Sequence, residues 1–228
     1  YIVDGAMMRS CRILILTIAA LLVALPALAA GDGVELAAFP PIGRLDYTVM
    51  REGSKVGTHT VEFARDGNRL TVTTNINIAV KMLGITIFRF EHHAEELWES
   101  GQLTRVTSRT DDDGEKRVVD LRREGDRLRG SYNGFAKDLP ATLIPSSMWH
   151  PDSMKQTALL DPIKGRERQV QIADKGEETV TVKGRDVTAH HYAVTGQIKR
   201  ELWYGPDGQI AQARFPAGDG SLIALVLR

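Results

Sequence analysis

Six histidines are the side chains of this sequence best suited to metal binding or proton transfer, and four of them form the pairs His92-His93 and His190-His191. Successive side chains on a strand point to opposite faces, so neither pair can hold one metal ion from one side. A zinc site or an acid–base pair would require His92, Glu96 and His190 to meet from neighbouring strands. No HExxH spacing supports such a site. We therefore interpret these histidines as hydrogen-bonded structural residues.

A serine nucleophile is the second chemistry that the residue types allow. Ser147 lies near His150 and Asp152 in the one irregular segment of the sequence, and loops on rigid scaffolds often carry catalytic residues. The chain has no G-x-S-x-G or S-x-x-K motif, and no P-loop, dinucleotide-binding or haem-attachment motif. We therefore favour Ser147 and Asp152 as helix caps. We expect no cofactor, and we favour a non-enzyme over an enzyme.

Aromatic side chains are the third group of candidates, and they favour the binding of an apolar molecule. Phe88, Phe90 and Trp98 share one face of a long predicted strand. Trp149 lies in the irregular segment, and Trp203 lies at the end of a late strand. These five residues could line a cavity for an apolar ligand. The alternative is that the tryptophans are core residues beneath the irregular segment.

Charge and cysteine content exclude several classes of partner and site. The 228 residues include 29 lysines and arginines and 29 aspartates and glutamates, so the formal net charge is zero. This balance removes the usual electrostatic argument for binding nucleic acid or an anionic membrane. A single cysteine cannot form an internal disulfide or a cysteine-rich zinc site.

Residues 9–30 have the three parts of a secretory signal peptide. Arg9 and Arg12 precede the apolar run Ile13–Leu25, and Ala27-Leu28-Ala29 has the A-x-A spacing of a cleavage site. The run is shorter than the ~20 residues of a membrane span. We therefore predict cleavage after Ala29, no remaining transmembrane anchor, and a location in the periplasm or outside a Gram-negative-type bacterium; a retained anchor is the alternative.

Cleavage would change the length, charge and cysteine content of the chain. It removes 29 residues, among them two arginines, one aspartate and the only cysteine, Cys11. The expected mature chain therefore has 199 residues, a formal charge of −1 and no cysteine.

After residue 43 the chain alternates apolar and polar residues, interrupted by turns rich in glycine, aspartate and asparagine. This pattern predicts about twelve antiparallel strands. Strands of about a dozen residues span ~40 Å and must twist. We therefore expect an all-β fold, in which one large, strongly curved antiparallel sheet forms an open barrel or half-barrel.

The same pattern predicts the organisation of the chain. Residues 1–29 are expected to form an N-terminal extension with the signal peptide, residues 30–43 a flexible linker, and residues 44–228 a single β-rich domain. Residues 140–162 lack alternation and contain four prolines. We predict a short helical or irregular connector there, which packs Trp149 and Leu160 against the sheet.

Several motifs, taken together, resemble one family of exported bacterial proteins. They include Val80-Lys81-x-Leu83-Gly84-Ile85, Glu96-Leu97-Trp98-x-x-Gly101, Pro145-Ser146-Ser147-x-Trp149, Ala189-His190-His191-Tyr192 and Leu202-Trp203-Tyr204. Through them nearly the whole mature chain resembles domain-of-unknown-function family 6134, which implies no activity and no site residue. The C-terminal hairpins also resemble periplasmic lipoprotein carriers with β half-barrels, which implies an apolar interior and, by analogy, a lipid cargo.

The favoured hypothesis is a protein of the cell envelope that binds a lipid or another apolar small molecule inside a β half-barrel. One alternative is a hydrolase or metal-dependent enzyme that uses His92, His190 and Glu96, or Ser147 with His150. The other is a module that binds an envelope protein through an edge strand or through the connector.

Overall fold

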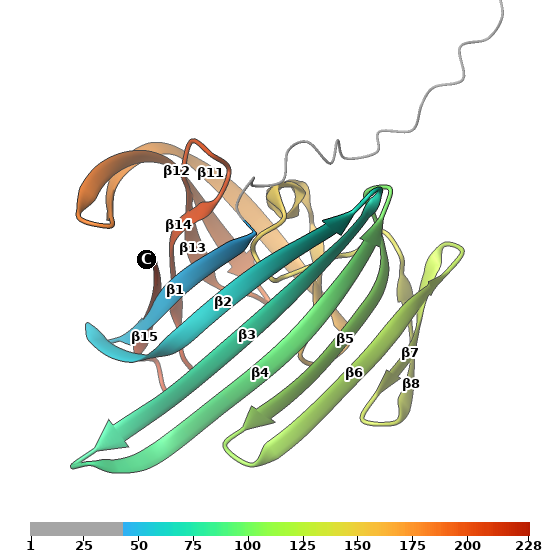
Figure 1. Cartoon of the computed structure of the whole chain (residues 1–228), viewed down its shortest axis with the longest axis horizontal. Helices are drawn as coiled ribbons and strands as arrows, with labels where there is room; N and C mark the ends of the chain where they lie inside the picture. Colours follow the sequence, from blue (N-terminus) through green and yellow to red (C-terminus); the bar gives the residue numbers. More distant parts are fainter. Residues whose placement is uncertain (1–42) are drawn as a thin grey trace, which may run out of the picture. The chain divides into compact units, whose positions relative to one another are not determined.

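The computed structural model describes residues 43–228, which belong to one compact unit and form a single fifteen-stranded sheet (Figure 1). The predicted signal peptide and nearly all of the predicted linker lie outside the described residues, so both stay predictions. No helix within residues 43–228 is long and apolar enough to cross a membrane.

The sheet begins with eight strands, each antiparallel to the next. They are β1 (Arg44–Arg51), β2 (Ser54–Asp66), β3 (Arg69–Met82), β4 (Ile85–Glu99), β5 (Gln102–Asp112), β6 (Glu115–Glu124), β7 (Arg127–Tyr132) and β8 (Phe135–Pro140). Two-residue turns with positive φ at both positions, such as Asp113-Gly114, join neighbouring strands. Such turns match the right-handed twist of a hairpin, which explains the glycines between the predicted strands.

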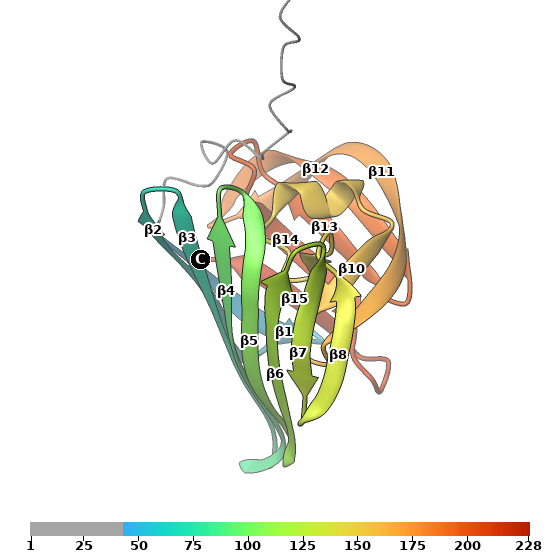
Figure 2. The ribbon, with the colours of Figure 1, turned by 90° about the vertical axis from the view of Figure 1, so that its right-hand side faces the viewer.

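The remaining elements return to the start of the sheet. They are β9 (Ile144–Pro145), the 3₁₀ helix η2 (Pro151–Lys155), β10 (Ala158–Asp161), β11 (Arg166–Val182), β12 (Arg185–Gly196), β13 (Arg200–Tyr204), β14 (Ile210–Pro216) and β15 (Leu222–Leu227). β15 pairs with β1, so the strand order runs from β8 through β1 and β15 to β9. Figure 2 shows β3–β8 on one side of the described region and β11–β14 on the other.

The sheet curves around the segment that links β8 to β11. In this segment the Trp149 ring packs edge-on against Trp98 of β4, with 5.4 Å between ring centroids. The Ser108 hydroxyl of β5 donates a hydrogen bond to the carbonyl of Pro162. A Cβ placed on Gly165 would lie 3.5 Å from side-chain atoms of Val119 and Tyr132. The linking segment therefore lies against the concave face of β4–β7 and fills part of the interior.

A second, smaller apolar cluster lies on the opposite face of the later strands. It contains Val180, Val182, Ala189, Trp203 and Ala211. The bulge between Asp174 and Gly176 makes this cluster possible, because one extra residue reverses the face on which the following side chains of β11 lie.

The predicted fold class is confirmed: the strands form one large sheet, antiparallel in every described pair except β9–β10, and the sheet is not closed into a barrel. Some local expectations were wrong. The sheet has fifteen strands where the alternation predicts about twelve, and β11 continues through its bulge as one strand of 17 residues. The segment predicted to be helical or irregular contains β9, η2 and β10.

The predicted cap of the helical turn was also wrong. The residue that caps η2 is His150, whose ring nitrogen Nδ1 accepts the backbone N–H of Asp152 at 3.2 Å. Ser147 lies three residues ahead of the cap and does not cap η2.

Close backbone approach at Gly57 generates the first testable prediction. An added Cβ would lie 2.1 Å from the carbonyl oxygen of Asn77, so Gly57→Ala must push β2 away from β3. We expect the free energy of unfolding in urea to fall by about 2 kcal/mol. Gly218→Ala is the control, because an added Cβ there meets no atom within 4 Å. Equal stabilities of the two variants would contradict the close approach.

Candidate functional site

The linking segment leaves one half of the concave face uncovered, and this half is a cavity of about 810 Å³. Its walls come from β1–β4, β14 and β15, the β10–β11 turn and residues 197–200. Apolar side chains form most of the lining, among them Ile76, Ile78, Val80, Phe88, Phe90 and Ile223. The alternation of β3 and β4 explains this, because Val80 pairs with Phe88 and Ile78 pairs with Phe90 on one face.

A polar row crosses the sheet at the inner end of this cavity. The strand pairing places four polar residues in line across β2 to β6, with Ile76 of β3 between the two histidines: His59, His92, Thr110 and Arg117. His92 Nδ1 lies 2.8 Å from the Thr110 hydroxyl. Burial lowers the pKa of both His59 and His92 to about 4, with a smaller contribution from neighbouring charges. Both imidazoles are therefore neutral at pH 7.

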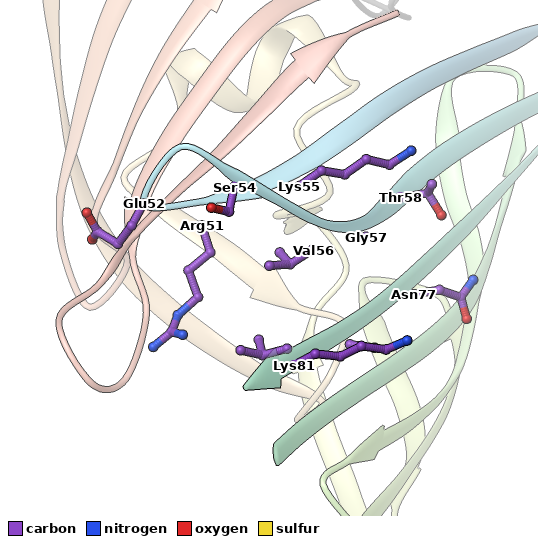
Figure 3. Close-up of a pocket in the computed structure, with 11 residues that line it drawn as sticks. Arg51, Glu52, Ser54, Lys55, Val56, Gly57, Thr58, Asn77 and Lys81 are labelled. Carbon is purple, nitrogen blue, oxygen red and sulfur yellow. The ribbon is translucent and has the colours of Figure 1, made fainter. Parts of the chain in front are cut away.

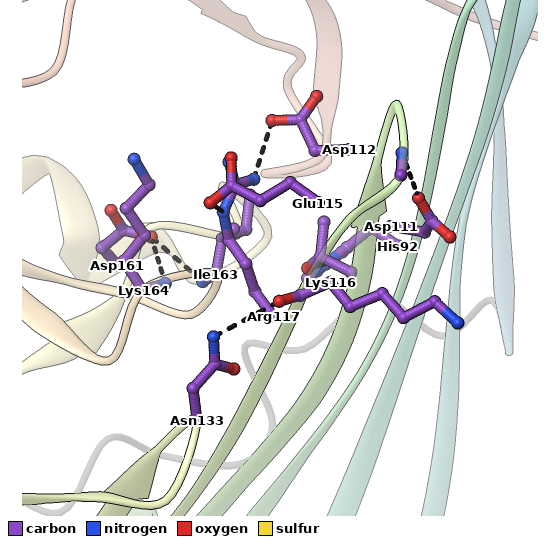
Figure 4. Close-up of polar contacts among 12 residues, drawn as sticks. His92, Asp111, Asp112, Glu115, Lys116, Arg117, Asn133, Asp161, Ile163 and Lys164 are labelled. Carbon is purple, nitrogen blue, oxygen red and sulfur yellow. Dashed lines mark hydrogen bonds and ion pairs between the residues drawn. The ribbon is translucent and has the colours of Figure 1, made fainter.

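Arg117 is the cation of this row, and its charge is fully paired. Its guanidinium donates to Asp112 at 2.7 Å and to Glu115 at 2.6 and 3.0 Å (Figure 4). These hydrogen bonds raise the pKa of Arg117 above its ordinary value. Asp112 also lines the cavity, so Arg117 neutralises a carboxylate at the cavity wall.

Behind the polar row, one buried carboxylate joins the linking segment to the sheet. Glu96 of β4 is 2% exposed, and its Oε2 accepts the indole N–H groups of Trp98 and Trp149, each at 3.0 Å. Burial raises the pKa of Glu96 to about 7, although hydrogen bonds from Ser147, Trp98 and Trp149 act in the opposite direction. His150 is 1% exposed and packs its ring against both indoles.

The predicted ligand-binding residues do not form one site. Phe88 and Phe90 line the cavity, whereas Trp98 and Trp149 are core residues that hold Glu96. Trp203 is on the opposite face, where it donates to Glu178 at 2.8 Å and stacks on His191. The inclusion of Trp203 was wrong because Leu202 and Tyr204 occupy the inward positions of β13. The alternative, that the tryptophans are core residues beneath the irregular segment, describes Trp98 and Trp149 but not Trp203.

The structure does not bring the proposed metal ligands together. Six strands separate β4, which carries His92 and Glu96, from β12, which carries His190. His190 Nε2 instead lies 2.6 Å from Asp174. Within residues 43–228, no three histidine, cysteine, aspartate or glutamate side chains gather as a metal site. The metal site required β4 and β12 to be neighbouring strands, and they are not.

The proposed Ser147–His150 pair is divided between two environments. Ser147 lines the cavity, whereas His150 is buried behind it and uses Nδ1 to cap η2. A substrate in the cavity would not reach this imidazole. This arrangement does not support a serine nucleophile with His150 as its base.

Sequence reasoning missed the polar residues of the cavity wall, above all His59, Arg168 and Arg200. Arg200 and His59 stand at inward positions of strands whose other inward residues are apolar, such as Leu202 and Val61. A charged or titratable residue in the apolar half of an alternating pattern was the available signal.

Comparison with known proteins adds a family and a fold. The model of the domain-of-unknown-function family DUF6134 matches residues 47–228, which confirms the resemblance inferred from the motifs. None of the curated proteins compared with the chain matches it. Among solved structures, a beta-barrel-like protein of the domain of unknown function DUF1849 from Brucella abortus has a TM-score of 0.58 and 15% identity. The match covers 81% of this chain and 96% of that chain, and it shows a shared fold.

The buried carboxylate generates a prediction about stability and pH. The pKa of Glu96 is about 7 in the folded protein against an ordinary value of 4.5. Between these values the unfolded chain loses its proton first, so the contribution of Glu96 to stability is full below pH 4.5 and is lost as the pH rises to 7. We expect the stability of the wild type relative to Glu96→Gln to fall by about 3 kcal/mol between pH 4.5 and 8.

Urea unfolding at a series of pH values measures this difference. Glu95→Gln is the matched control, because Glu95 is the exposed neighbour of Glu96 on the same strand. Its stability should follow that of the wild type at every pH. A wild-type curve parallel to that of Glu96→Gln would contradict the raised pKa.

Proposed function

Given that the chain belongs to the DUF6134 family, whose description assigns no activity, we propose from its cavity that this protein binds an apolar or amphiphilic small molecule. The observation that supports the proposal is a largely apolar cavity of about 810 Å³ inside the curve of the sheet. Pockets for small molecules commonly have volumes of ~300–1,000 Å³ and mostly apolar linings.

The energetics of burial favour a ligand with a hydrocarbon chain. Each buried methylene contributes about 0.8 kcal/mol, so ten of them contribute about 8 kcal/mol before the costs of association. The inner faces of β3 and β4 provide an extended apolar strip for such a chain, with Ile78, Val80, Phe88 and Phe90 along it. Hydrogen-bonded strands hold these walls, so the cavity already has its shape before a ligand binds.

The predicted signal peptide supports a place of action in the periplasm or outside the cell. There the protein would meet lipids and other poorly soluble molecules of the envelope. The alternative of a hydrolase has no supporting geometry at Ser147 and His150. We therefore retain ligand binding as the single proposed function.

Titration with the apolar fluorescent probe 1-N-phenylnaphthylamine tests the proposal. We expect saturable binding to the purified chain, and at least tenfold weaker binding by Phe90→Asp, because the new carboxylate would have to lose its water in contact with the probe. Phe135→Asp is the control, because Phe135 is 73% exposed at another turn. Circular dichroism establishes that the variants fold. No saturable binding by the wild type, or equal binding by the two variants, would contradict the proposal.

A further inference from the structure

We propose that the ligand is an amphiphile with an acidic head group, a carboxylate or a phosphate, and that Arg200 binds this head group at the inner wall of the cavity. The inference rests on the proposed function and adds the chemical class of the ligand. Three observations support it: the position of Arg200, the pairing of the cavity carboxylates, and further buried polar atoms without partners.

Arg200 is the first residue of β13 and lines the cavity. Its Nη1 donates one hydrogen bond, to the backbone carbonyl of Ser146 at 2.9 Å. Within residues 43–228 no carboxylate oxygen forms an ion pair with this guanidinium. A guanidinium has five N–H donors in a planar fork that matches a carboxylate or a phosphate. Arg200 therefore has donors left for an acidic group in the cavity.

The carboxylates of the cavity wall already have other partners. Asp112 accepts from Arg117 at 2.7 Å. Asp161 Oδ1 accepts the backbone N–H groups of Ile163 and Lys164 at 3.0 and 3.1 Å (Figure 4). Asp219 forms an ion pair with Arg51. The acidic residues of the lining are thus engaged, whereas Arg200 carries a charge without a paired anion.

Burial makes that unpaired charge costly. It lowers the pKa of Arg200 to about 10, although Tyr204 and Asp161 act in the opposite direction. A cation and an anion attract each other more strongly where water is excluded than at a surface. An acidic head group beside Arg200 would recover part of the desolvation cost.

Other buried polar atoms of the same lining lack hydrogen-bond partners, among them Nε of Arg168 and Nε2 of His59. Buried polar groups without partners are rare in native proteins and call for a bound water or ligand. Arg168 and Lys199 add further positive charges to the lining, so the polar groups without partners favour an anion over a cation.

Displacement of the fluorescent probe by ligands of equal chain length tests the inference. Dodecanoate, dodecan-1-ol and dodecylammonium differ only in the head group. We expect the wild type to bind dodecanoate at least tenfold more tightly than the alcohol, and the ammonium ion most weakly. Arg200→Met should bring dodecanoate to within about threefold of the alcohol, because the variant has no guanidinium to bind the acid. Arg200→Lys should give an intermediate preference.

Arg214→Met is the matched control. Arg214 stacks on Trp203 on the opposite face, so its loss removes one charge without touching the cavity and should keep the preference for dodecanoate. Equal binding of acid and alcohol by the wild type would overturn the inference while the proposed function stands. Absence of probe binding would overturn the proposed function itself. The comparison of dodecanoate with dodecan-1-ol on the wild type tests the acidic head group even if Arg200→Met does not fold.

A separate observation concerns the turn between β3 and β4. Four large apolar side chains are exposed there: Met82 by 60%, Leu83 by 96%, Ile85 by 69% and Ile87 by 49%. We infer that this apolar tip, residues 82–87, inserts into the interface of a lipid bilayer that contains anionic lipids. A contiguous exposed apolar patch on a soluble domain marks a surface that another phase or molecule covers.

Charge and continuity support a bilayer as the occupant. Lys55 and Lys81 line a more polar hollow beside the tip (Figure 3), and both are exposed and form no ion pair within the described part of the chain. Lysines beside an apolar tip fit the anionic surface of a membrane. Ile87 of the tip and Val80, two residues before it, both belong to the cavity lining, so the apolar surface continues from the cavity to the tip.

Flotation with vesicles tests this second inference. We expect the chain to float with vesicles of phosphatidylcholine that contain phosphatidylglycerol, an anionic lipid. A smaller fraction should float with vesicles of phosphatidylcholine alone. Leu83→Glu should reduce the floated fraction at least fivefold, whereas Phe135→Glu, at a turn far along the chain, should not. Equal flotation of the wild type and Leu83→Glu would overturn the inference, and so would an equal loss in both variants.

Discussion

One buried carboxylate holds the linking segment against the sheet, and the shape of the interior depends on it. Glu96 projects from β4 and accepts two indole N–H groups, one from its own strand and one from Trp149 of the segment. An indole N–H can only donate a hydrogen bond, so it needs an acceptor when it is buried. The carboxyl group therefore fixes where the segment crosses the concave face, and so which half of that face stays open.

The uncovered half of the concave face follows from the length of two strands. β3 and β4 have 14 and 15 residues, which is longer than the linking segment can cover. Their inward positions near Leu70 and Trp98 are buried beneath the segment, whereas those near Val80 and Phe88 face the cavity. Between the two regions lies the polar row that includes His59 and His92. The interior thus changes along the strands from a packed core, through polar groups, to an apolar cavity that ends at an exposed turn.

Much of this arrangement follows from local pattern. Alternation correctly placed Phe88, Phe90, His92, Glu96 and Trp98 on one face of one strand, because the period of two is a property of each strand alone. Paired neighbours, bulges and the path of an irregular segment depend on contacts distant in sequence. Alternation therefore could not show that β1 pairs with β15 or that the bulge in β11 reverses its faces.

The misplacement of Trp203 has the same origin. Its distance from the cavity depends on the face of β13 that the whole sheet turns inward. Arg200, at an inward position of the same strand, escaped notice because a charged residue at a strand end commonly faces water. Only the curvature of the sheet shows that it faces a cavity.

The central claim is that the open half of the interior holds an amphiphile with an acidic head group. Native mass spectrometry tests it most directly, with detergent-free protein that has been incubated with a lipid extract of a Gram-negative envelope. The account predicts one bound molecule per chain, which extraction in solvent identifies as a long-chain acid or phosphate. A spectrum with the mass of the unbound chain alone, or with a bound neutral or cationic lipid, would contradict it.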